Sequence, residues 1–239
     1  MMKNETVKFA VLLFLFAGLA GLALGATYQL TRERIAANDD GVRRTALEAV
    51  LPVHDNNPFA EKFAWEKYRE ALLAAAPAEF PPAGDAFWQS EVFPAMQGGT
   101  WNGAALQVER IGYGGPVQTA IGVDGAGNLV NIRVVACAQE TPGLGTKAAE
   151  RAFLDGVQYQ DPAARVCRSL ANTANFSVNK DGGDIAAVTG ATISSRAVIN
   201  AVAQGMRRLA ALQQVWLAAA ASAVATDAQT GATRPGGYR

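Results

Sequence analysis

The sequence predicts an α+β protein in which one N-terminal transmembrane helix precedes a domain with a small antiparallel sheet flanked by helices. Three observations predict this fold: an uncharged apolar run near the N-terminus, short β-like runs around a glycine-rich turn, and a helical pattern of apolar residues after Thr192. With 239 residues, 50% of them hydrophobic, the chain can form one membrane segment and one domain with its own core.

The apolar run covers residues 9–30, which carry no charge. A membrane-spanning helix needs roughly 20 apolar residues, so this run is long enough. A cleaved signal peptide is the alternative, because Lys3 and Lys8 form a basic start and Ala23-Leu-Gly25 offers small residues for cleavage. The length of the run and Tyr28 near its far end favour a retained anchor. We therefore expect a signal anchor at residues 9–30, preceded by a short segment at residues 1–8 on the cytoplasmic side.

Residues 31–100 are expected to form a helical stalk and a connecting region. Residues 31–51 have a helical pattern that ends before Pro52, and this helix is either continuous or interrupted at residues 38–41. Residues 57–76 are a second helical candidate, followed by a proline-rich loop. We find no chemistry in this region.

Residues 101–212 are expected to form the folded domain, and residues 213–239 the end of an Ala-rich helix and a flexible tail. The pattern changes near Ala104 to β-like runs, and two of them flank a glycine-rich turn, which predicts a hairpin. The strands are expected at residues 106–111, 117–123, 129–135, 165–170 and 175–179, with a fixed loop at 140–145 and a short helix at 146–154.

The segment Thr189-Gly-Ala-Thr192 places a hydroxyl behind two small residues at the predicted start of the last helix. Gly190 permits backbone angles closed to other residues, and Ala191 leaves room for a bulky group to approach the hydroxyl. The free N–H groups and the dipole of the helix would face an anion such as a phosphate. The alternative is a helix cap, in which Thr192 or Ser194 accepts a backbone hydrogen bond and does nothing else.

Composition argues against several other functions. The 21 basic and 21 acidic residues cancel, and no Lys/Arg run is present, so nucleic acid is not expected as a partner. One histidine, His54, and two distant cysteines give no clustered ligands for zinc, haem or an iron–sulfur centre, although a site made only of carboxylates stays open. No Ser or Cys has a histidine partner in view, so we expect no independent catalytic site, and a hydrolase with Thr192 as nucleophile is the weakest hypothesis.

The segment from Thr189 to Val198 resembles the flavinylation motif of FMN-binding domains in Rnf complexes and in sodium-pumping NADH:quinone oxidoreductases. Gly112–Pro116, Glu140–Gly145 and Lys180–Asp184 resemble the same family, most closely its RnfG branch. The resemblance implies that the FMN phosphate is esterified to Thr192. It further implies cofactor contacts from Thr189, Gly190, Ala191, Glu140, Thr141, Gly143, Leu144, Gly145 and Lys147.

The resemblance also implies a function: an electron-transfer subunit that carries covalent FMN in a membrane-bound complex coupling electron transfer to ion translocation. Its partners would be the other membrane and redox subunits of the Rnf complex, and a flavin transferase for maturation. It would lie in the inner membrane as a single-pass protein with its flavin domain on the periplasmic side. The charges flanking the anchor leave this orientation ambiguous by the positive-inside rule. The alternatives are the NqrC subunit of a sodium-pumping NADH:quinone oxidoreductase, or a non-redox membrane-anchored scaffold.

The chain departs from the family pattern at two positions. Ala186 stands where the flavinylation motif has Asp, and Ala138 stands where the family tends to carry His before Glu140. In the tail, residues 227–233 repeat the full motif, which makes Thr233 a second candidate acceptor, although no helix or apolar pattern follows it. Two cysteines, Cys137 and Cys167, could pair or remain buried free thiols.

Overall fold

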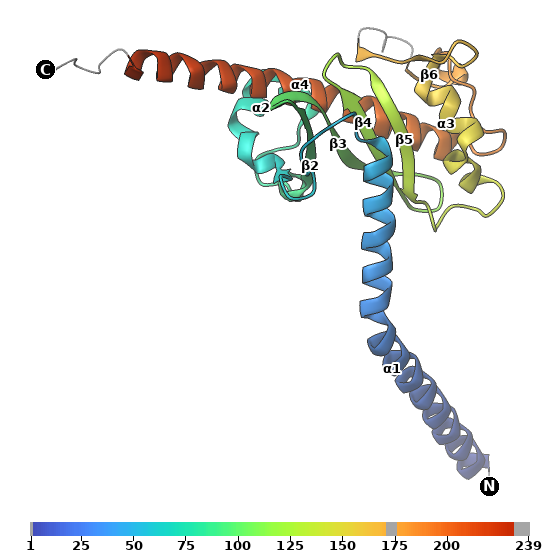
Figure 1. The fold of residues 1–239 in the computed structure, drawn as a ribbon. Coiled ribbons are helices and arrows are strands. Elements are labelled where there is room, and N and C mark those ends of the chain that lie inside the picture. The colour runs from blue at the N-terminus through green and yellow to red at the C-terminus, as the bar shows by residue number, and fades with distance from the viewer. Residues whose placement is uncertain (1, 171–175, 232–239) are drawn as a thin grey trace, which may run out of the picture. The chain divides into compact units, whose positions relative to one another are not determined.

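The structure is a computed structural model that describes residues 2–170 and 176–231 (Figure 1). The chain forms two compact units, residues 1–44 and 45–239. The first unit consists of the greater part of helix α1 (Met2–Val50), which runs without interruption through residues 38–41. Of the helices in the described ranges, α1 alone is long and apolar enough to cross a membrane. Thr233 lies outside the described residues.

The second unit is built on a five-stranded sheet whose neighbouring strands are consecutive in sequence and antiparallel. The three strands predicted between residues 106 and 135 are confirmed, and two further strands precede them. The strands are β1 (Phe63–Ala64), β2 (Glu91–Gln97), β3 (Thr100–Ile111), β4 (Pro116–Asp124) and β5 (Leu129–Ala136). A small antiparallel sheet with flanking helices was the predicted fold, and it is confirmed.

Helix α4 (Thr192–Gly231) packs across one face of this sheet (Figure 1). Its apolar side chains recur at helical spacing and are buried against β3 and β4, as the sequence predicted. The helix approaches the sheet closely at Gly205, where an added Cβ would lie 2.6 Å from the Ile121 side chain. This packing fixes the direction of α4, and therefore the place where its first residue, Thr192, lies.

The end of α1 covers the opposite face of the sheet within the second unit. Leu47 and Val50 pack with Phe93 and with alanines of the central strands in a separate small core. At Gly122 an added Cβ would lie 1.6 Å from the Val50 carbonyl oxygen. Only glycine at this position therefore allows the end of α1 to approach the sheet so closely. The sheet is therefore covered on both faces.

Two predicted helices differ in the structure. Only the second half of residues 57–76 is helical, as η1 (Trp65–Tyr68) and α2 (Arg69–Ala75), because Phe63 and Ala64 before it pair with β2 as strand β1. The predicted helix at 146–154 is divided at Glu150, which has extended backbone angles, into η4 (Gly145–Ala149) and α3 (Arg151–Gln158).

The strands predicted after residue 160 are mostly wrong. Only β7 (Val166–Cys167) forms within residues 165–170, and it pairs with β6 (Tyr159–Asp161). The described part of residues 175–179 makes one bridge, from Val178 to Ile185, before the turn η6 (Asn179–Asp181). Cys137 and Cys167 are free thiols.

Candidate functional site

The turn that leads into α4 leaves Thr192 just inside the helix. Gly190 has φ +80°, which glycine adopts without strain, and the Ser195 N–H donates to the Ala191 carbonyl oxygen at 3.0 Å. Ala191 is therefore the capping residue, and Thr192 is the first residue of the helix. The predicted alternative, in which Thr192 serves only as a cap, does not fit this geometry.

Three hydroxyl groups lie in the first turn of α4, and two of them already form hydrogen bonds within the protein. The Ser195 hydroxyl accepts from the Val188 N–H at 3.0 Å and donates to the Ala191 carbonyl at 2.9 Å. The Ser194 hydroxyl donates to Glu140 Oε2 at 2.5 Å. Both serines are buried, whereas Thr192 is half-buried and its hydroxyl has no hydrogen-bond partner among the described residues. Of the three, Thr192 alone is free to react or to bind.

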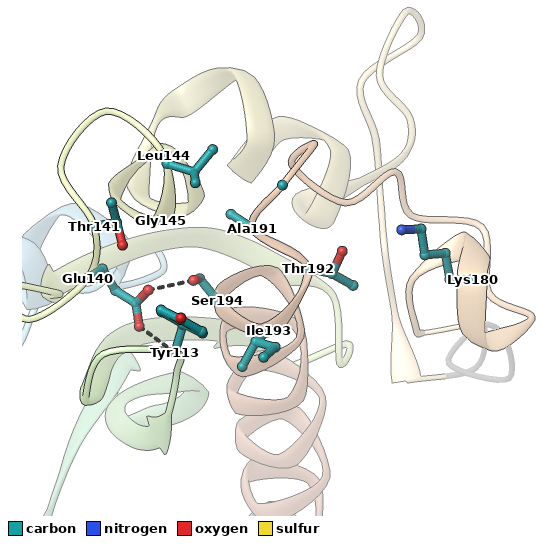
Figure 2. Close-up of a pocket in the computed structure, with 11 residues that line it drawn as sticks. Tyr113, Glu140, Thr141, Leu144, Gly145, Lys180, Ala191, Thr192, Ile193 and Ser194 are labelled. Atoms are coloured by element: carbon teal, nitrogen blue, oxygen red, sulfur yellow. Dashed lines mark hydrogen bonds between the residues drawn. The ribbon is translucent and has the colours of Figure 1, made fainter.

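Thr192 opens into a pocket of about 420 Å³ between the start of α4 and two loops (Figure 2). The structure brings together seven predicted site residues in its lining: Glu140, Thr141, Leu144, Gly145, Gly190, Ala191 and Thr192. It adds four that the sequence analysis did not name as cofactor contacts: Tyr113, Lys180, Ile193 and Ser194. Tyr113 and Lys180 lie within the glycine-containing stretches that carried the family resemblance, and that position was the available signal.

The remaining predicted site residues lie around this lining. Thr189 contributes to a second hollow of about 330 Å³, which shares Lys180, Gly190 and Thr192 with the first. Gly143 shapes the preceding loop with φ +71°, and its N–H donates to the Thr146 hydroxyl. Lys147 is exposed on η4 and lines neither hollow.

Large apolar side chains surround the pocket and remain open to solvent. Tyr113 is 72% exposed, Leu144 is 40% exposed and Ile193 is 47% exposed. They come from three separate segments: the turn after β3, the loop after β5 and the first turn of α4 (Figure 2). A concave site that combines an apolar rim with polar groups in its lining is typical of a pocket for a flat organic ligand with a polar end.

A buried carboxylate holds these three segments together. Glu140 is 2% exposed, and its Oε1 accepts from the N–H groups of Tyr113 at 2.7 Å and Gly114 at 3.2 Å, while its Oε2 accepts from Ser194 (Figure 2). At Gly112 an added Cβ would lie 2.1 Å from Oε1, and at Gly145 it would lie 2.5 Å from Oε2. The glycines of both loops are thus required by the position of one carboxylate.

Lys180 stands on the other side of Thr192, on η6, and Figure 2 shows its amino group directed toward Thr192. Two ion pairs fix its segment. Asp181 accepts from Arg196 of α4 at 2.7 and 2.6 Å, and Asp184 accepts from the buried Arg168 at 3.0 Å. These two carboxylates are the acids nearest to Ala186 in sequence, and both are engaged by arginines.

Two groups near the site have shifted pKa values. Hydrogen bonding from Arg196 and its positive charge hold the pKa of Asp181 below its usual value. Burial raises the pKa of the Cys137 thiol, and the negative charge of Glu140 raises it further. Within the described residues, no group of three His, Cys, Asp or Glu side chains is arranged to hold a metal ion.

The comparisons with known proteins identify the class first. Residues 112–207, which contain the pocket, match the FMN-binding domain family. Residues 1–50 match the RnfG N-terminal region.

Two relatives then give the family. The chain is 32% identical to the G subunit of the ion-translocating oxidoreductase complex of Stutzerimonas stutzeri, over 85% of this chain and 81% of that protein. It is 33% identical to the G subunit from Pseudomonas aeruginosa, over 86% of this chain and 89% of that protein. The chain therefore belongs to the family of RnfG proteins, the G subunits of ion-translocating oxidoreductase complexes. This membership resolves the choice between RnfG and the NqrC subunit of the sodium-pumping reductase.

Solved structures similar to the chain include the C subunit of the Na⁺-translocating NADH-quinone reductase from Parabacteroides distasonis. It is 19% identical, with a TM-score of 0.43 over 74% of this chain and 96% of that one. NqrC from Shewanella oneidensis is 18% identical, with a TM-score of 0.45 over 75% and 99%.

Proposed function

We propose that this chain is an electron-transfer subunit that carries FMN as a phosphoester on Thr192 within an ion-translocating oxidoreductase complex. The observation that carries the proposal is the state of the three hydroxyls in the first turn of α4. Only the Thr192 hydroxyl is half-exposed, unbonded among the described residues, and open to a pocket with an apolar rim. Ser194 and Ser195 are excluded as acceptors, because both are buried and already hydrogen-bonded.

The residues present fit both ends of FMN. Tyr113, Leu144 and Ile193 offer apolar surface for a flat ring, and the Gly112 and Gly145 segments supply backbone close to it. Such a division, with apolar surface for a ring and polar groups for orientation, is usual in cofactor sites.

The phosphate end would lie at the start of α4. Within the described chain, the N–H groups of Thr192, Ile193 and Ser194 donate to no protein acceptor, as expected for the first residues of a helix. These groups and the helix dipole stabilise the single negative charge of a phosphodiester, and Lys180 adds a full positive charge on the same side.

Attachment requires a flavin transferase and an activated flavin nucleotide, a phosphoanhydride. The Thr192 oxygen would form the new P–O bond while the anhydride P–O bond breaks and the nucleotide leaving group departs. The hydroxyl proton would pass to a base of the transferase, since Glu140, the carboxylate in this pocket lining, already accepts from two backbone N–H groups and from Ser194. Ala186 lies in the second hollow, which Thr192 also lines. The transferase would contact this position when it recognises the motif.

Bound FMN supplies one-electron and two-electron redox chemistry, and the protein tethers and orients it. The anchor at residues 9–30 would hold the subunit in the inner membrane, with the flavin domain on the periplasmic side. A covalent bond suits that side, because a dissociated flavin would be lost. Other membrane and redox subunits of the complex would donate and accept the electrons, and ion translocation would occur in them, because residues 9–30 contain no charge to conduct an ion.

The test is to co-express the full chain with a flavin transferase and to measure intact mass and in-gel flavin fluorescence. We expect one FMN on the wild type and none on Thr192→Ala. Thr100→Ala is the matched control, because it makes the same change at an exposed threonine that lines neither hollow, and it should load fully. Thr233→Ala tests the second copy of the motif and should also load fully.

Two results would contradict the proposal. If flavin loading persists in Thr192→Ala and disappears in Thr233→Ala, the attachment site is Thr233 in the tail. No adduct on the wild type, under conditions that load a known acceptor protein, would favour a non-redox scaffold.

A further inference from the structure

Glu140 places an uncompensated negative charge in the wall of the pocket. Its carboxylate is 2% exposed and lines the same pocket as Thr192. None of the ion pairs between described residues includes it; its partners are two backbone N–H groups and one hydroxyl. Such neutral donors stabilise a carboxylate without cancelling its charge.

The surroundings hold this charge at one place. The two oxygens are bound to different segments, and the space into which the side chain could turn is closed by the backbone at Gly112 and Gly145. The carboxylate therefore keeps a fixed position relative to the first turn of α4, which carries Thr192.

A neighbouring group already responds to this charge. The pKa of the Cys137 thiol is raised first by burial and second by Glu140, and the Glu140 N–H donates to the Cys137 carbonyl oxygen at 3.0 Å. Charges act strongly on one another where water is excluded.

We infer that Glu140 sets the reduction potential of the flavin, by holding a fixed negative charge against the ring and so lowering the potential. This inference rests on the proposed function. Reduction of a bound flavin by an electron from its donor would add one negative charge beside the Glu140 carboxylate. The repulsion between the two charges makes reduction less favourable than it would be beside a neutral residue. Glu140 acts here as a positioning and tuning residue, because it touches no reacting bond.

Two variants separate the charge of Glu140 from its hydrogen bonds. Glu140→Gln removes the charge, but its amide oxygen can accept from Tyr113 and Gly114 and its amide nitrogen can donate to Ser194. Ser194→Ala keeps the charge and removes one of the same hydrogen bonds. Both are made in the full chain, loaded by the transferase, and checked by intact mass before their flavin is titrated with dithionite under potentiometric control.

We expect Glu140→Gln to raise the ratio of reduced to oxidised flavin at a fixed ambient potential at least tenfold, which is about 59 mV for a one-electron couple. Ser194→Ala, which keeps the charge, should shift this ratio less than Glu140→Gln does. An unchanged potential in loaded Glu140→Gln, or an equal rise in Ser194→Ala, would overturn the inference while leaving the flavin site intact. A wild type that takes up no flavin would overturn the proposed function, and this inference with it.

Discussion

Two walls of the Thr192 pocket are built in opposite ways. The Glu140 wall comprises residues 112–116 and 140–145, and its central carboxylate is 2% exposed with three hydrogen-bond donors around it. The Lys180 wall comprises residues 176–185, and its pair of Arg196 with Asp181 is 42% and 38% exposed. One wall is fixed by a buried network, and the other is held largely by ion pairs in contact with water.

The difference shows how one short site can meet two demands. An aromatic ring needs fixed orientation, and buried hydrogen bonds supply it because leaving any member unpaired is costly. A phosphodiester needs positive charge, and an exposed lysine supplies it without a desolvation penalty. Changes in the Glu140 wall should therefore cost more stability than changes in the Lys180 wall.

The largest effect is expected for Gly112→Ala in the Glu140 wall. The new Cβ would lie 2.1 Å from Glu140 Oε1, and the buried carboxylate cannot move away without losing its bonds to Tyr113 and Gly114. We expect a loss of about 2–3 kcal/mol in the free energy of unfolding, measured by urea denaturation, together with reduced flavin loading. Gly84→Ala is the matched control, because no atom lies within 4 Å of its added Cβ. Equal stability of the two variants would contradict the description of this wall.

A smaller effect is expected for Asp184→Asn in the Lys180 wall. The Arg168 side chain is 4% exposed, so loss of its carboxylate partner leaves a buried charge bonded only to neutral oxygens. Asp184 itself is 42% exposed, and water will replace part of the interaction. We expect a loss of about 1–2 kcal/mol in the free energy of unfolding. Calorimetry should show this loss while flavin still attaches to Thr192; a loss larger than that of Gly112→Ala would reverse the ranking of the two walls.

The sheet shows how far local pattern predicts this fold. β3, β4 and β5 were predicted from alternation and a glycine-rich turn, because each lies in the sheet centre or beside a tight connection. β2 was missed because it contains Pro94, and proline usually argues against an inner strand. The structure accommodates it because β1 pairs only with Glu91 and Val92, so Pro94 lies beyond the paired part of that side.

The local sequence pattern predicts only part of the candidate site. The start of α4 and the accessibility of Thr192 follow from nearby residues, and the motif was sufficient to predict both. The hydrogen bond from Ser194 to Glu140 joins residues 54 positions apart in the sequence. Only the packing of α4 on the sheet brings these two residues together. Lys180 was likewise predicted only as part of a motif, since its approach to Thr192 depends on the pairing of Asp181 with Arg196.

The reactivity of Cys137 can sharpen the account of the Glu140 wall. Iodoacetamide reacts with the thiolate, and the charge of Glu140 is the second cause, after burial, of the raised pKa of this thiol. We expect Glu140→Gln to increase the native alkylation rate of Cys137 severalfold, measured by mass spectrometry in a Cys167→Ser background. Glu150→Gln, a change of the same kind at an exposed position, should leave the rate unchanged. If Cys137 reacts at the wild-type rate in Glu140→Gln, the charge of Glu140 does not affect the pKa of the Cys137 thiol.

The smallest effect is expected for Asp181→Asn, and it should depend on pH. The pKa of Asp181 is lowered in the folded protein, first by hydrogen bonding from Arg196 and then by its charge, so the pair stabilises the fold at pH values above the ordinary carboxyl range. That contribution is lost as the pH falls below 3.8, the usual value, and through the lowered one, because the carboxylate is then protonated in both states. Thermal unfolding should therefore show a small difference between Asp181→Asn and the wild type at neutral pH that shrinks as the pH falls below 3.8. Because the pair is exposed, added salt at neutral pH should shrink the same difference. A difference that survives both acid and salt would mean that Asp181 supports the Lys180 wall through packing, and the contrast between the two walls would then lose its electrostatic basis.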